Sequence, residues 1–277
     1  MYNIKCIKMF DSVVAMTFHK PMANGKTKPC LLDAYNISIS ENIEVVTKFA
    51  AGCEEKAFTL VIEAFANFLA CDLNLPIPQS KLVNLTDEFL DAVNIDPPLK
   101  HMMINSKPFA FGVERLPTSY STLTNPLFAL TQEQLQSALE IFIFDMLIKN
   151  PDRKIGNPNC LTNGKTFAIF DHDLSLRPKV FSWDKDPWED QYMEATEEYR
   201  KHIFFSSLKG KSESLDTSDF ISAWKNLTDE RLGEYIGAIP NEWLITCNDR
   251  ANQVLDFIKS LRDNIDQALF IIREVLK

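Results

Sequence analysis

The feature that most constrains this chain is a long apolar helical pattern that stops in a loop rich in asparagine, aspartate and proline. Residues 131–149 repeat apolar side chains at helical spacing, and most of this helix is apolar nearly all round, so we expect it to be buried. Thr131 and Gln134 have the spacing of a capping box at its start. Asn150-Pro151 ends the helix, since the residue before proline avoids helical geometry. The loop that follows, Asn150–Asn159, is the most informative stretch of the sequence.

A short β-hairpin is expected directly after this loop. Asn163-Gly164 lies between two short β-like runs and is typical of a two-residue type I′ turn. In that register the numbers of paired residues sum to 327, and Asp171 falls opposite Gly156. Because facing residues lie about 4.5–5.5 Å apart at Cα, Asp171 is then a direct neighbour of Asn157.

These side chains suit magnesium and proton transfer. A carboxylate from Asp171 and a carbonyl oxygen from Asn157 are the hard ligands that Mg²⁺ accepts beside phosphates and water. Asp152 lies five residues before Asn157 and can take the proton of an attacking hydroxyl. Loops commonly contain such residues, and Asp152 alone is explained by an ordinary turn. The meeting of all three residues favours a functional site.

The first hundred residues alternate short β patterns with one helix. The expected helix is Glu54–Leu73, and the expected strands are Ser12–His19, Cys30–Tyr35, Ile43–Phe49, Lys81–Leu85 and Met102–Gly112. Beyond the hairpin the pattern is helical, with helices expected at Trp188–Leu208, Thr217–Asn226, Asp229–Gly237 and Asp249–Val275. We therefore expect a small, mostly antiparallel sheet with one helix on it, followed by a helical half.

Composition narrows the class of protein and its partners. The chain of 277 residues carries a net charge of −9, which argues against nucleic acid as the main partner. Its six cysteines are scattered without metal-ligand spacing, so neither a zinc site nor a disulfide framework is expected, and a reducing cytoplasm is the natural location. No apolar stretch is long enough to span a membrane, and we expect no membrane partner.

The motifs resemble a known family. Asp152-x4-Asn157 followed by Ile169-Phe170-Asp171 resembles the catalytic and metal-binding loops of the protein-kinase-like fold. The amino-acid sequence of these loops is most similar to that of HipA-like kinases, and the Asp-Arg and Asn elements also resemble type II phosphatidylinositol 4-kinases. The resemblance implies that Asp152 is the base and that Asn157 and Asp171 hold metal. The chain departs from ordinary eukaryotic kinases: Asn150 replaces the usual histidine, Asp171-His172-Asp173 replaces Asp-Phe-Gly, and no Ala-Pro-Glu follows.

That fold also requires a lysine on the third strand, paired with a glutamate on the next helix, to hold the nucleotide phosphates. Lys48 is on the third expected strand, and alone it would be read as a solvated strand-end lysine. Glu63 is the preferred partner on the helix, because its own face otherwise carries the small residues Thr59, Ala66 and Ala70. HipA-like sequences also place a glutamate about twelve residues before a Leu-Pro, which again selects Glu63.

Two further segments are assigned from the resemblance. Gly25, Lys26, Thr27 and Lys28 lie between the first two strands, where a phosphate-covering loop is expected, although a plain hairpin turn explains them equally well. Glu114–Leu116 occupies the place of the adenine-contacting hinge, where backbone groups do the work. We place the hinge between the two halves of the chain at Glu114–Pro126.

The sequence thus predicts an α+β, bilobal protein-kinase-like fold, with a small antiparallel-sheet N-lobe at residues 1–116 and a larger, mostly helical C-lobe at residues 117–277. ATP and Mg²⁺ are expected between the lobes, with phosphoryl transfer to a hydroxyl, foremost of a protein serine or threonine. A small antitoxin-like partner is implied by the family alone. Three alternatives stay open: a lipid or small-molecule kinase, a pseudokinase that binds nucleotide or a partner without transfer, and a metal-dependent hydrolase built on Asp171-His172-Asp173.

Overall fold

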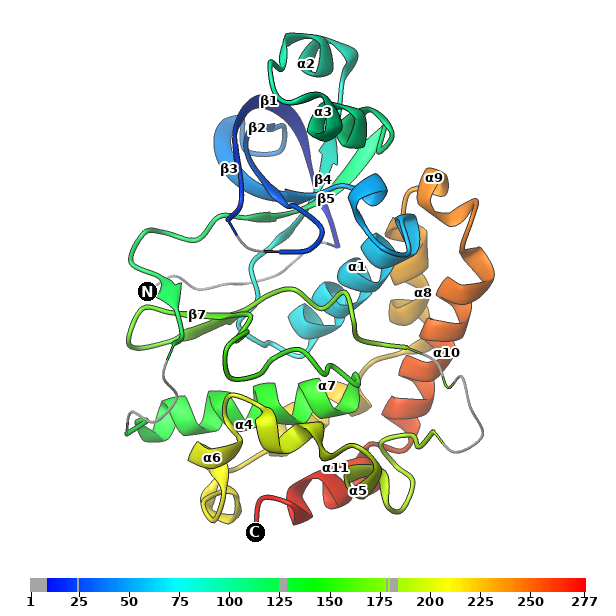
Figure 1. Ribbon diagram of the computed structural model, residues 1–277. Coiled ribbons are helices and arrows are strands. Elements are labelled where there is room, and N and C mark those ends of the chain that lie inside the picture. Colours follow the sequence, from blue (N-terminus) through cyan, green and yellow to red (C-terminus); the bar gives the residue numbers. More distant parts are fainter. Residues whose placement is uncertain (1–8, 24, 125–128, 178, 180–183) are drawn as a thin grey trace. The chain divides into compact units, whose positions relative to one another are not determined.

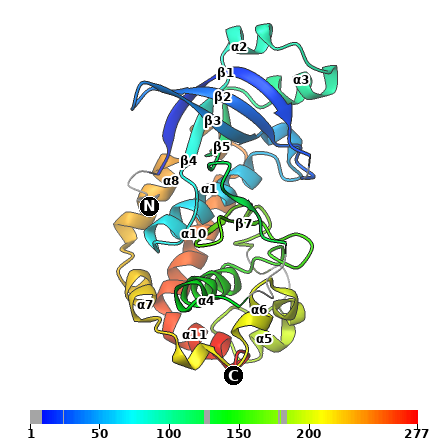
Figure 2. The same ribbon diagram turned by 90° about the vertical axis from the view of Figure 1, so that its left-hand side faces the viewer.

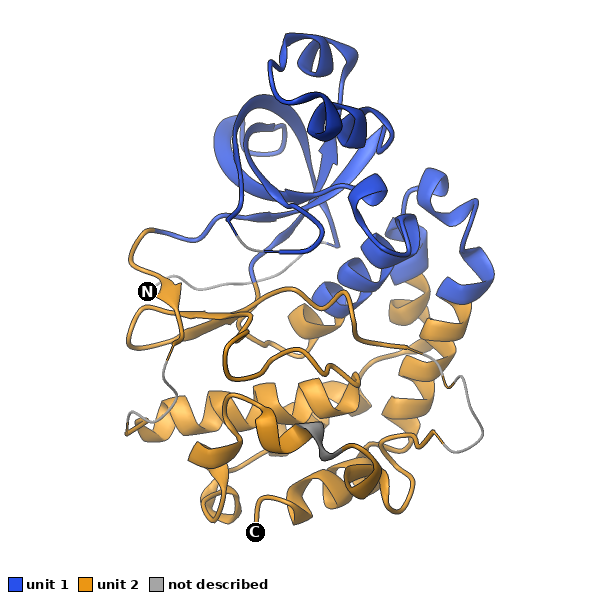
Figure 3. Ribbon diagram, in the orientation of Figure 1, with its two compact units in different colours: residues 1–68, 78–117, 235–251 blue, residues 69–77, 118–234, 252–277 orange. Residues whose placement is uncertain are grey.

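A computed structural model describes residues 9–23, 25–124, 129–177, 179 and 184–277 (Figure 1). The chain is mixed α/β, with a sheet-rich N-terminal region followed by helices, which confirms that part of the expected fold class. It divides into two compact units (Figure 3). Unit 1 comprises residues 1–68, 78–117 and 235–251, and unit 2 comprises residues 69–77, 118–234 and 252–277.

Unit 1 contains a closed five-stranded barrel, in the order β1-β2-β3-β5-β4 (Figure 2). Its strands are β1 (Asp11–Pro21), β2 (Cys30–Asn36), β3 (Glu41–Lys48), β4 (Ser80–Asn84) and β5 (Phe109–Glu114). Neighbouring strands are antiparallel except β1 and β4, which are parallel. Alternate residues such as Leu32, Ala34 and Val45 are fully buried inside the barrel, as the period of two in a strand requires.

The connection between β4 and β5 contains two helices that the sequence patterns did not reveal. They are α2 (Asp87–Ala92) and α3 (Pro97–Ile104), and they lie at one end of the barrel (Figure 2). Thr86 caps α2 by accepting a hydrogen bond from Phe89 N, and Asp96 caps α3, which begins on a proline. The expected strand Met102–Gly112 is therefore wrong in its first part, because β5 begins only at Phe109.

The remaining elements of unit 1 pack on aromatic side chains. The turn η1 (Ala50–Gly52) leads to α1 (Ala57–Asp72), which agrees with the expected helix. The ring of Phe10 lies edge-on to those of Phe68 and Trp243, at centroid distances of 4.9 and 6.1 Å. Trp243, on α9 (Asn241–Leu244), also donates a hydrogen bond to the carbonyl oxygen of Phe109 (3.2 Å). The segment 235–251 is thus tied to the barrel.

Unit 2 is built around α4 (Gln132–Leu147), which is buried over most of its length. Its capping box between Thr131 and Gln134 is present in full, as predicted. A small sheet, in the order β6-β7-β8, consists of β6 (Ser121–Thr122), β7 (Cys160–Thr162) and β8 (Phe167–Ile169). The later elements are α5 (Tyr192–Ala195), η2 (Glu197–Lys201), α6 (Phe205–Leu208), η3 (Ser212–Ser214), α7 (Ser218–Lys225), α8 (Asp229–Ala238), α10 (Asn248–Asp263) and α11 (Ile265–Glu274).

Two of the expected C-terminal helices are wrong in length. The segment 188–208 is not one helix. Gln191 adopts a left-handed conformation (φ 66°) before α5, and Thr196 and His202 leave helical geometry (ψ 52° and 136°) at the two ends of η2. The helix expected at residues 249–275 is broken at Asn264 into α10 and α11. Asparagine competes with helical hydrogen bonds through its side chain, and Asn264 donates to the carbonyl oxygen of Ser260 (2.9 Å).

The cysteines call for one correction. Cys30, Cys53, Cys160 and Cys247 are buried free thiols, but Cys71 is disulfide-bonded, which the sequence analysis, expecting no disulfide framework, did not anticipate. Spacing along the sequence reveals metal motifs and disulfide-rich frameworks, but not a bond between residues far apart in the chain.

Gly112 provides a test of the closed barrel. A Cβ atom there would lie 2.4 Å from Val45 Cγ1 and 2.8 Å from Val83 Cγ2, so the interior has no room for a side chain. We expect Gly112→Ala to lower the free energy of unfolding by about 1–3 kcal/mol. Denaturant titration followed by circular dichroism measures the effect. In the control Gly233→Ala, on α8, a Cβ meets nothing within 4 Å. That change should be neutral or stabilise by up to about 1 kcal/mol. Equal effects of the two changes would contradict a packed barrel.

Candidate active site

Asp152 lies in a loop whose polar side chains converge on its carboxylate. Asn157 Nδ2 and Asn159 Nδ2 both donate to Asp152 Oδ2, at 2.7 and 3.3 Å. Lys154 Nζ lies 3.4 Å from Asp152 Oδ1. On the backbone side, Asp152 N donates to Asn150 Oδ1 (3.1 Å). The carboxylate is held in one orientation yet keeps 22% of its side chain exposed, as a group that must reach a substrate requires.

Lys154 and Asn159 are members of this group that the sequence analysis did not select. Lys154 places a positive charge beside Asp152, two residues after it. Asn159 is buried and adopts a left-handed conformation (φ 42°). The spacing Asp-x-Lys was the available signal for Lys154, whereas nothing in the pattern separated Asn159 from an ordinary loop asparagine.

The predicted hairpin register is wrong by two residues. β7 and β8 pair Cys160 with Ile169 and Thr162 with Phe167, so paired numbers sum to 329, and Asp171 is not opposite Gly156. The turn is a four-residue loop, residues 163–166, because Asn163 Oδ1 accepts hydrogen bonds from the backbone N–H groups of residues 165 and 166 (3.0 and 2.9 Å). Side-chain capping of this kind favours a loop longer than the type I′ turn that Asn-Gly alone indicates. The expected pairing of Asp171 with Gly156 is therefore wrong. Continued to residue 171, the observed register would place Asp171 opposite Pro158, which is also next to Asn157.

Asp171 has a different close neighbour in unit 2. A carboxylate oxygen of Asp171 and one of Asp173 lie within 4.8 Å of each other. Asp171 adopts φ 63° directly after β8, a left-handed conformation that aspartate tolerates better than most residues. Two such carboxylates are hard oxygen donors of the kind that Mg²⁺ accepts. The sequence analysis considered Asp173 only for the hydrolase alternative.

A fully buried ionic network lies beneath the Asp152 loop. Asp145, on α4, accepts hydrogen bonds from Arg153 Nε (2.5 Å), Arg153 Nη2 (3.2 Å), Asn150 Nδ2 (2.8 Å) and His202 Nε2 (3.0 Å). Burial by itself would raise the pKa of Asp145, but the Arg153 guanidinium and His202 outweigh it and hold this pKa well below its ordinary value. Asp145 is therefore a buried, ionised anchor with four donors.

The two buried histidines are neutral on hydrogen-bonding grounds. Arg153 Nη2 lies 2.7 Å from His172 Nε2, and since a guanidinium only donates, this nitrogen accepts. His202 Nδ1 accepts from Phe204 N (3.2 Å), so its Nε2 carries the proton given to Asp145. Burial lowers the pKa of His202, although Asp145 acts in the opposite direction. Because His172 Nε2 accepts from Arg153, this ring nitrogen is not offered to a metal.

In unit 1 the structure brings Lys48 and Glu63 together. Lys48, the last residue of β3, forms an ion pair through Nζ with Glu63 Oε1 on α1. Both residues are buried, at 9% and 3% exposure. The sequence-based pairing of these two residues is thus observed as a contact, and the reading of Lys48 as a solvated strand-end lysine is wrong.

The loop between β1 and β2 holds the predicted phosphate-covering residues. Lys28 N donates to Gly25 O (3.2 Å), and Gly25 adopts φ 115°, where a Cβ would lie 2.9 Å from Pro29 Cδ. Lys26 and Lys28 are exposed, and Thr27 is half-buried. The loop is therefore a tight, glycine-dependent turn that carries two exposed lysines.

The segment expected at the adenine-contacting hinge begins at the end of β5. Glu114 is half-buried and pairs with Lys81 (3.1 Å). Leu116 is also half-buried. Pro126, the expected end of the hinge, lies outside the described residues.

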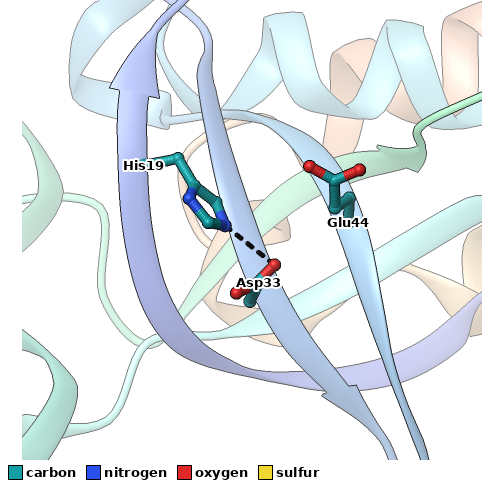
Figure 4. A group of neighbouring side chains, drawn as sticks. All are labelled: His19, Asp33 and Glu44. Atoms are coloured by element: carbon teal, nitrogen blue, oxygen red, sulfur yellow. Dashed lines mark ion pairs between the residues drawn. The ribbon is translucent and has the colours of Figure 1, made fainter. Parts of the chain in front are cut away.

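A second group of possible metal ligands lies on the barrel of unit 1 (Figure 4). His19, at a register shift of β1, contacts Asp33 Oδ1 of β2 through Nε2 (2.8 Å), and Asp33 faces Glu44 across the β2–β3 ladder. Arg115 already pairs with Glu44 (2.7 Å). Arg115 therefore already compensates the charge of Glu44, and Asp33 is in contact with the His19 ring.

The comparison with protein families decides the relationship of the chain. The family model described as HipA-like kinase matches residues 20–270, nearly the whole chain. The chain belongs to the HipA-like kinase family. The family assignment covers the Lys48–Glu63 pair, the Asp152 loop and the Asp171 segment alike. Among curated proteins, none matches the chain.

Membership of this family makes a kinase-type transfer of a phosphoryl group the function to explain. Within the described ranges, no helix of this family member is both long and apolar enough to cross a membrane.

The buried network predicts acid sensitivity. Because the pKa of His202 is lowered in the folded state, the stability that it contributes is complete above the unfolded value of about 6.5 and is lost as the pH falls towards the folded value. Thermal unfolding between pH 7.5 and 5 should show the unfolding temperature falling for the natural chain. His202→Gln keeps an amide donor for Asp145 and should flatten this dependence. The exposed His101→Gln should behave like the natural chain, and a flattening by His101→Gln instead would contradict the assignment.

Proposed function

We propose that this HipA-like kinase family member transfers the γ-phosphoryl group of ATP, with Mg²⁺, to the hydroxyl of a protein serine or threonine. The observation that carries the proposal is the Asp152 carboxylate, oriented by Asn157 and Asn159, in the same unit as the neighbouring carboxylates of Asp171 and Asp173. The family match supports the kinase class. The acceptor, ATP and Mg²⁺ belong to the proposal.

Asp152 is the general base in this proposal. Its Oδ2 is occupied by two amide donors, and Oδ1 lies toward Lys154, so the orientation of the carboxylate is fixed before a substrate arrives. Asp152 takes the proton of the acceptor hydroxyl as the oxygen attacks phosphorus. Lys154 stabilises negative charge that develops beside the base. Catalysis by positioning and charge is what a loose phosphoryl-transfer transition state requires.

Asn157 and Asp171 are the proposed metal ligands, with Asp173 as an additional one. The amide of Asn157 turns its Nδ2 to Asp152, which leaves Oδ1 as the atom able to hold a cation. When bound, Mg²⁺ neutralises charge on the phosphates and orients them. Asp171 and Asp173 offer carboxylate oxygens within 4.8 Å of each other, which is close enough to hold one cation between them.

The proposed residues of the sheet-rich half bind the nucleotide. Lys48 contacts the phosphates, and Glu63 fixes the ammonium group by their buried ion pair. Gly25, Lys26, Thr27 and Lys28 cover the phosphates through backbone N–H groups and two lysine charges. Backbone groups of Glu114–Leu116 contact the adenine. We keep residues 1–116 and 117–277 as the proposed lobes, and a small antitoxin-like protein as the proposed partner by family analogy.

The first test uses γ-labelled ATP with Mg²⁺ and cell lysate. The natural chain should label protein on serine or threonine. Asp152→Asn should lower the rate about 10²–10⁴-fold, because it removes the base while keeping the shape of the side chain. Asp87→Asn, an exposed change on α2, is the matched control and should keep full activity. If label appears only in lipid or in small molecules, the acceptor is not a protein. If the chain binds ATP and transfers no label at all, it is a pseudokinase.

The second test separates nucleotide binding from chemistry. Lys48→Met and Glu63→Gln both break the buried ion pair. The first removes the ammonium group, and the second removes the carboxylate that fixes it, so both should raise the KM for ATP as well as lower kcat. Steady-state kinetics over a range of ATP concentrations measures both constants. The reference is Lys107→Met, which removes another lysine of unit 1 that is paired with a carboxylate, Asp87, and should leave the KM for ATP unchanged in the folded protein. Equal kinetics of Lys48→Met and the natural chain would remove Lys48 from the site.

A further inference from the structure

One buried side chain connects the segment of the proposed base with the segment of the proposed metal ligand. Arg153 follows Asp152 directly in the chain and is 1% exposed. Its Nη1 donates to the carbonyl oxygens of Asn159 and Phe170, the latter at 3.4 Å. Its Nη2 donates to His172 Nε2 at 2.7 Å. Arg153 therefore contacts the residue before Asp171 and the residue after it.

The guanidinium has its orientation fixed from the other side. Asp145 binds Nε and Nη2 through both carboxylate oxygens, at 2.5 and 3.2 Å. His202 and Asn150 donate two further hydrogen bonds to the Asp145 carboxylate, and Asp145 is fully buried on α4. A planar group with bidentate support on one edge presents its remaining N–H groups in fixed directions, which a lysine ammonium cannot do.

Asp171 lies just beyond the end of a strand. β8 ends at Ile169, and the last ladder-like hydrogen bond runs from Phe170 N to Asn159 O (3.2 Å). Asp171 then takes a left-handed conformation (φ 63°), which leaves the strand direction. The contacts of Arg153 with Phe170 and His172 bracket this turn, and they fix where the Asp171 carboxylate points relative to Asp152.

We propose that Arg153 is a positioning residue that sets the geometry between the base Asp152 and the metal ligand Asp171, with Asp145 as its anchor. This inference rests on the proposed function for the identity of the metal site. Arg153 touches neither substrate nor metal. It acts by holding two short segments, residues 152–159 and 170–172, on one planar group. Groups that orient metal ligands typically contribute 10–100-fold to metal affinity or activity.

The closing experiment measures Mn²⁺ binding by electron paramagnetic resonance, together with thermal unfolding and transfer kinetics, on the full chain. The part of the Mn²⁺ binding that Asp171→Asn removes is the part that belongs to the proposed site. Arg153→Lys keeps the charge but cannot span the same partners, and should weaken that Mn²⁺ about 10–100-fold and lower kcat by a similar factor, with the KM for ATP changed less. Restoring the arginine codon in the variant gene should restore both values.

Arg231→Lys is the matched control. Arg231, on α8, is held by Asp72 through Nε and Nη2 at 2.8 Å each, the same bidentate geometry. The variant Arg231→Lys should lower the unfolding temperature. It should change the Mn²⁺ affinity by no more than about twofold, because no contact that orients a metal ligand is lost. If Arg153→Lys does not fold, His172→Ala removes one side of the bracket and should weaken Mn²⁺ about tenfold.

The outcomes separate the two proposals. If Asp171→Asn loses Mn²⁺ but Arg153→Lys, or His172→Ala in its place, binds it like the natural chain, the positioning role is overturned and the proposed function stands. If Arg153→Lys weakens Mn²⁺ while the natural chain transfers no phosphoryl group, the positioning role stands and the proposed function falls. If Asp171→Asn leaves all Mn²⁺ binding intact, the metal site and the positioning role are both overturned.

Discussion

The buried ion pair of Asp145 and Arg153 is the interaction on which unit 2 depends. Asp145 lies on the best-buried helix of that unit, and its carboxylate has four donors around it. Removing one partner of a buried pair commonly costs about 3–5 kcal/mol, because the other charge is left without compensation. A hydrophobic replacement of the pair would be stable in many proteins, so stability alone is a weak reason for it. Its geometric consequence is the fixed direction of the remaining guanidinium N–H groups.

This constraint explains why so many polar side chains converge in one loop without disorder. Asn150 bridges Asp145 and the backbone of Asp152, and Arg153 carries the link to the strand that ends before Asp171. Each buried polar group in this chain of contacts has a partner, which is the condition for a rigid polar network. The exposed side of the same loop is left for Asp152 and Lys154. Adjacent residues thus form both the rigid interior and the exposed surface that carries the proposed base.

The sequence was informative where local rules decide the structure. The capping box of α4, the end of that helix at Asn150-Pro151, the strands β1 to β3 and the pairing of Lys48 with Glu63 all follow from period, caps and motif spacing. It failed where side chains override those rules. Asn163 and Thr162 cap the hairpin loop and shift its register by two residues, and Gln191 divides the expected helix at 188–208. Arg153 was missed because its role depends on partners in three other segments, at Asp145, Asn159 and residues 170–172, and Asp173 was considered only for the hydrolase alternative.

The central claim, a divalent-cation site at Asp171 and Asp173 in a HipA-like kinase, is tested most directly by anomalous scattering. Crystals grown with Mn²⁺ and a non-hydrolysable ATP analogue would be measured near the manganese absorption edge. The account predicts an anomalous peak within ligand distance of the Asp171 carboxylate, with Asn157 or Asp173 as a further ligand. A protein that binds the analogue but shows its manganese only elsewhere, such as at His19, Asp33 and Glu44, would contradict it.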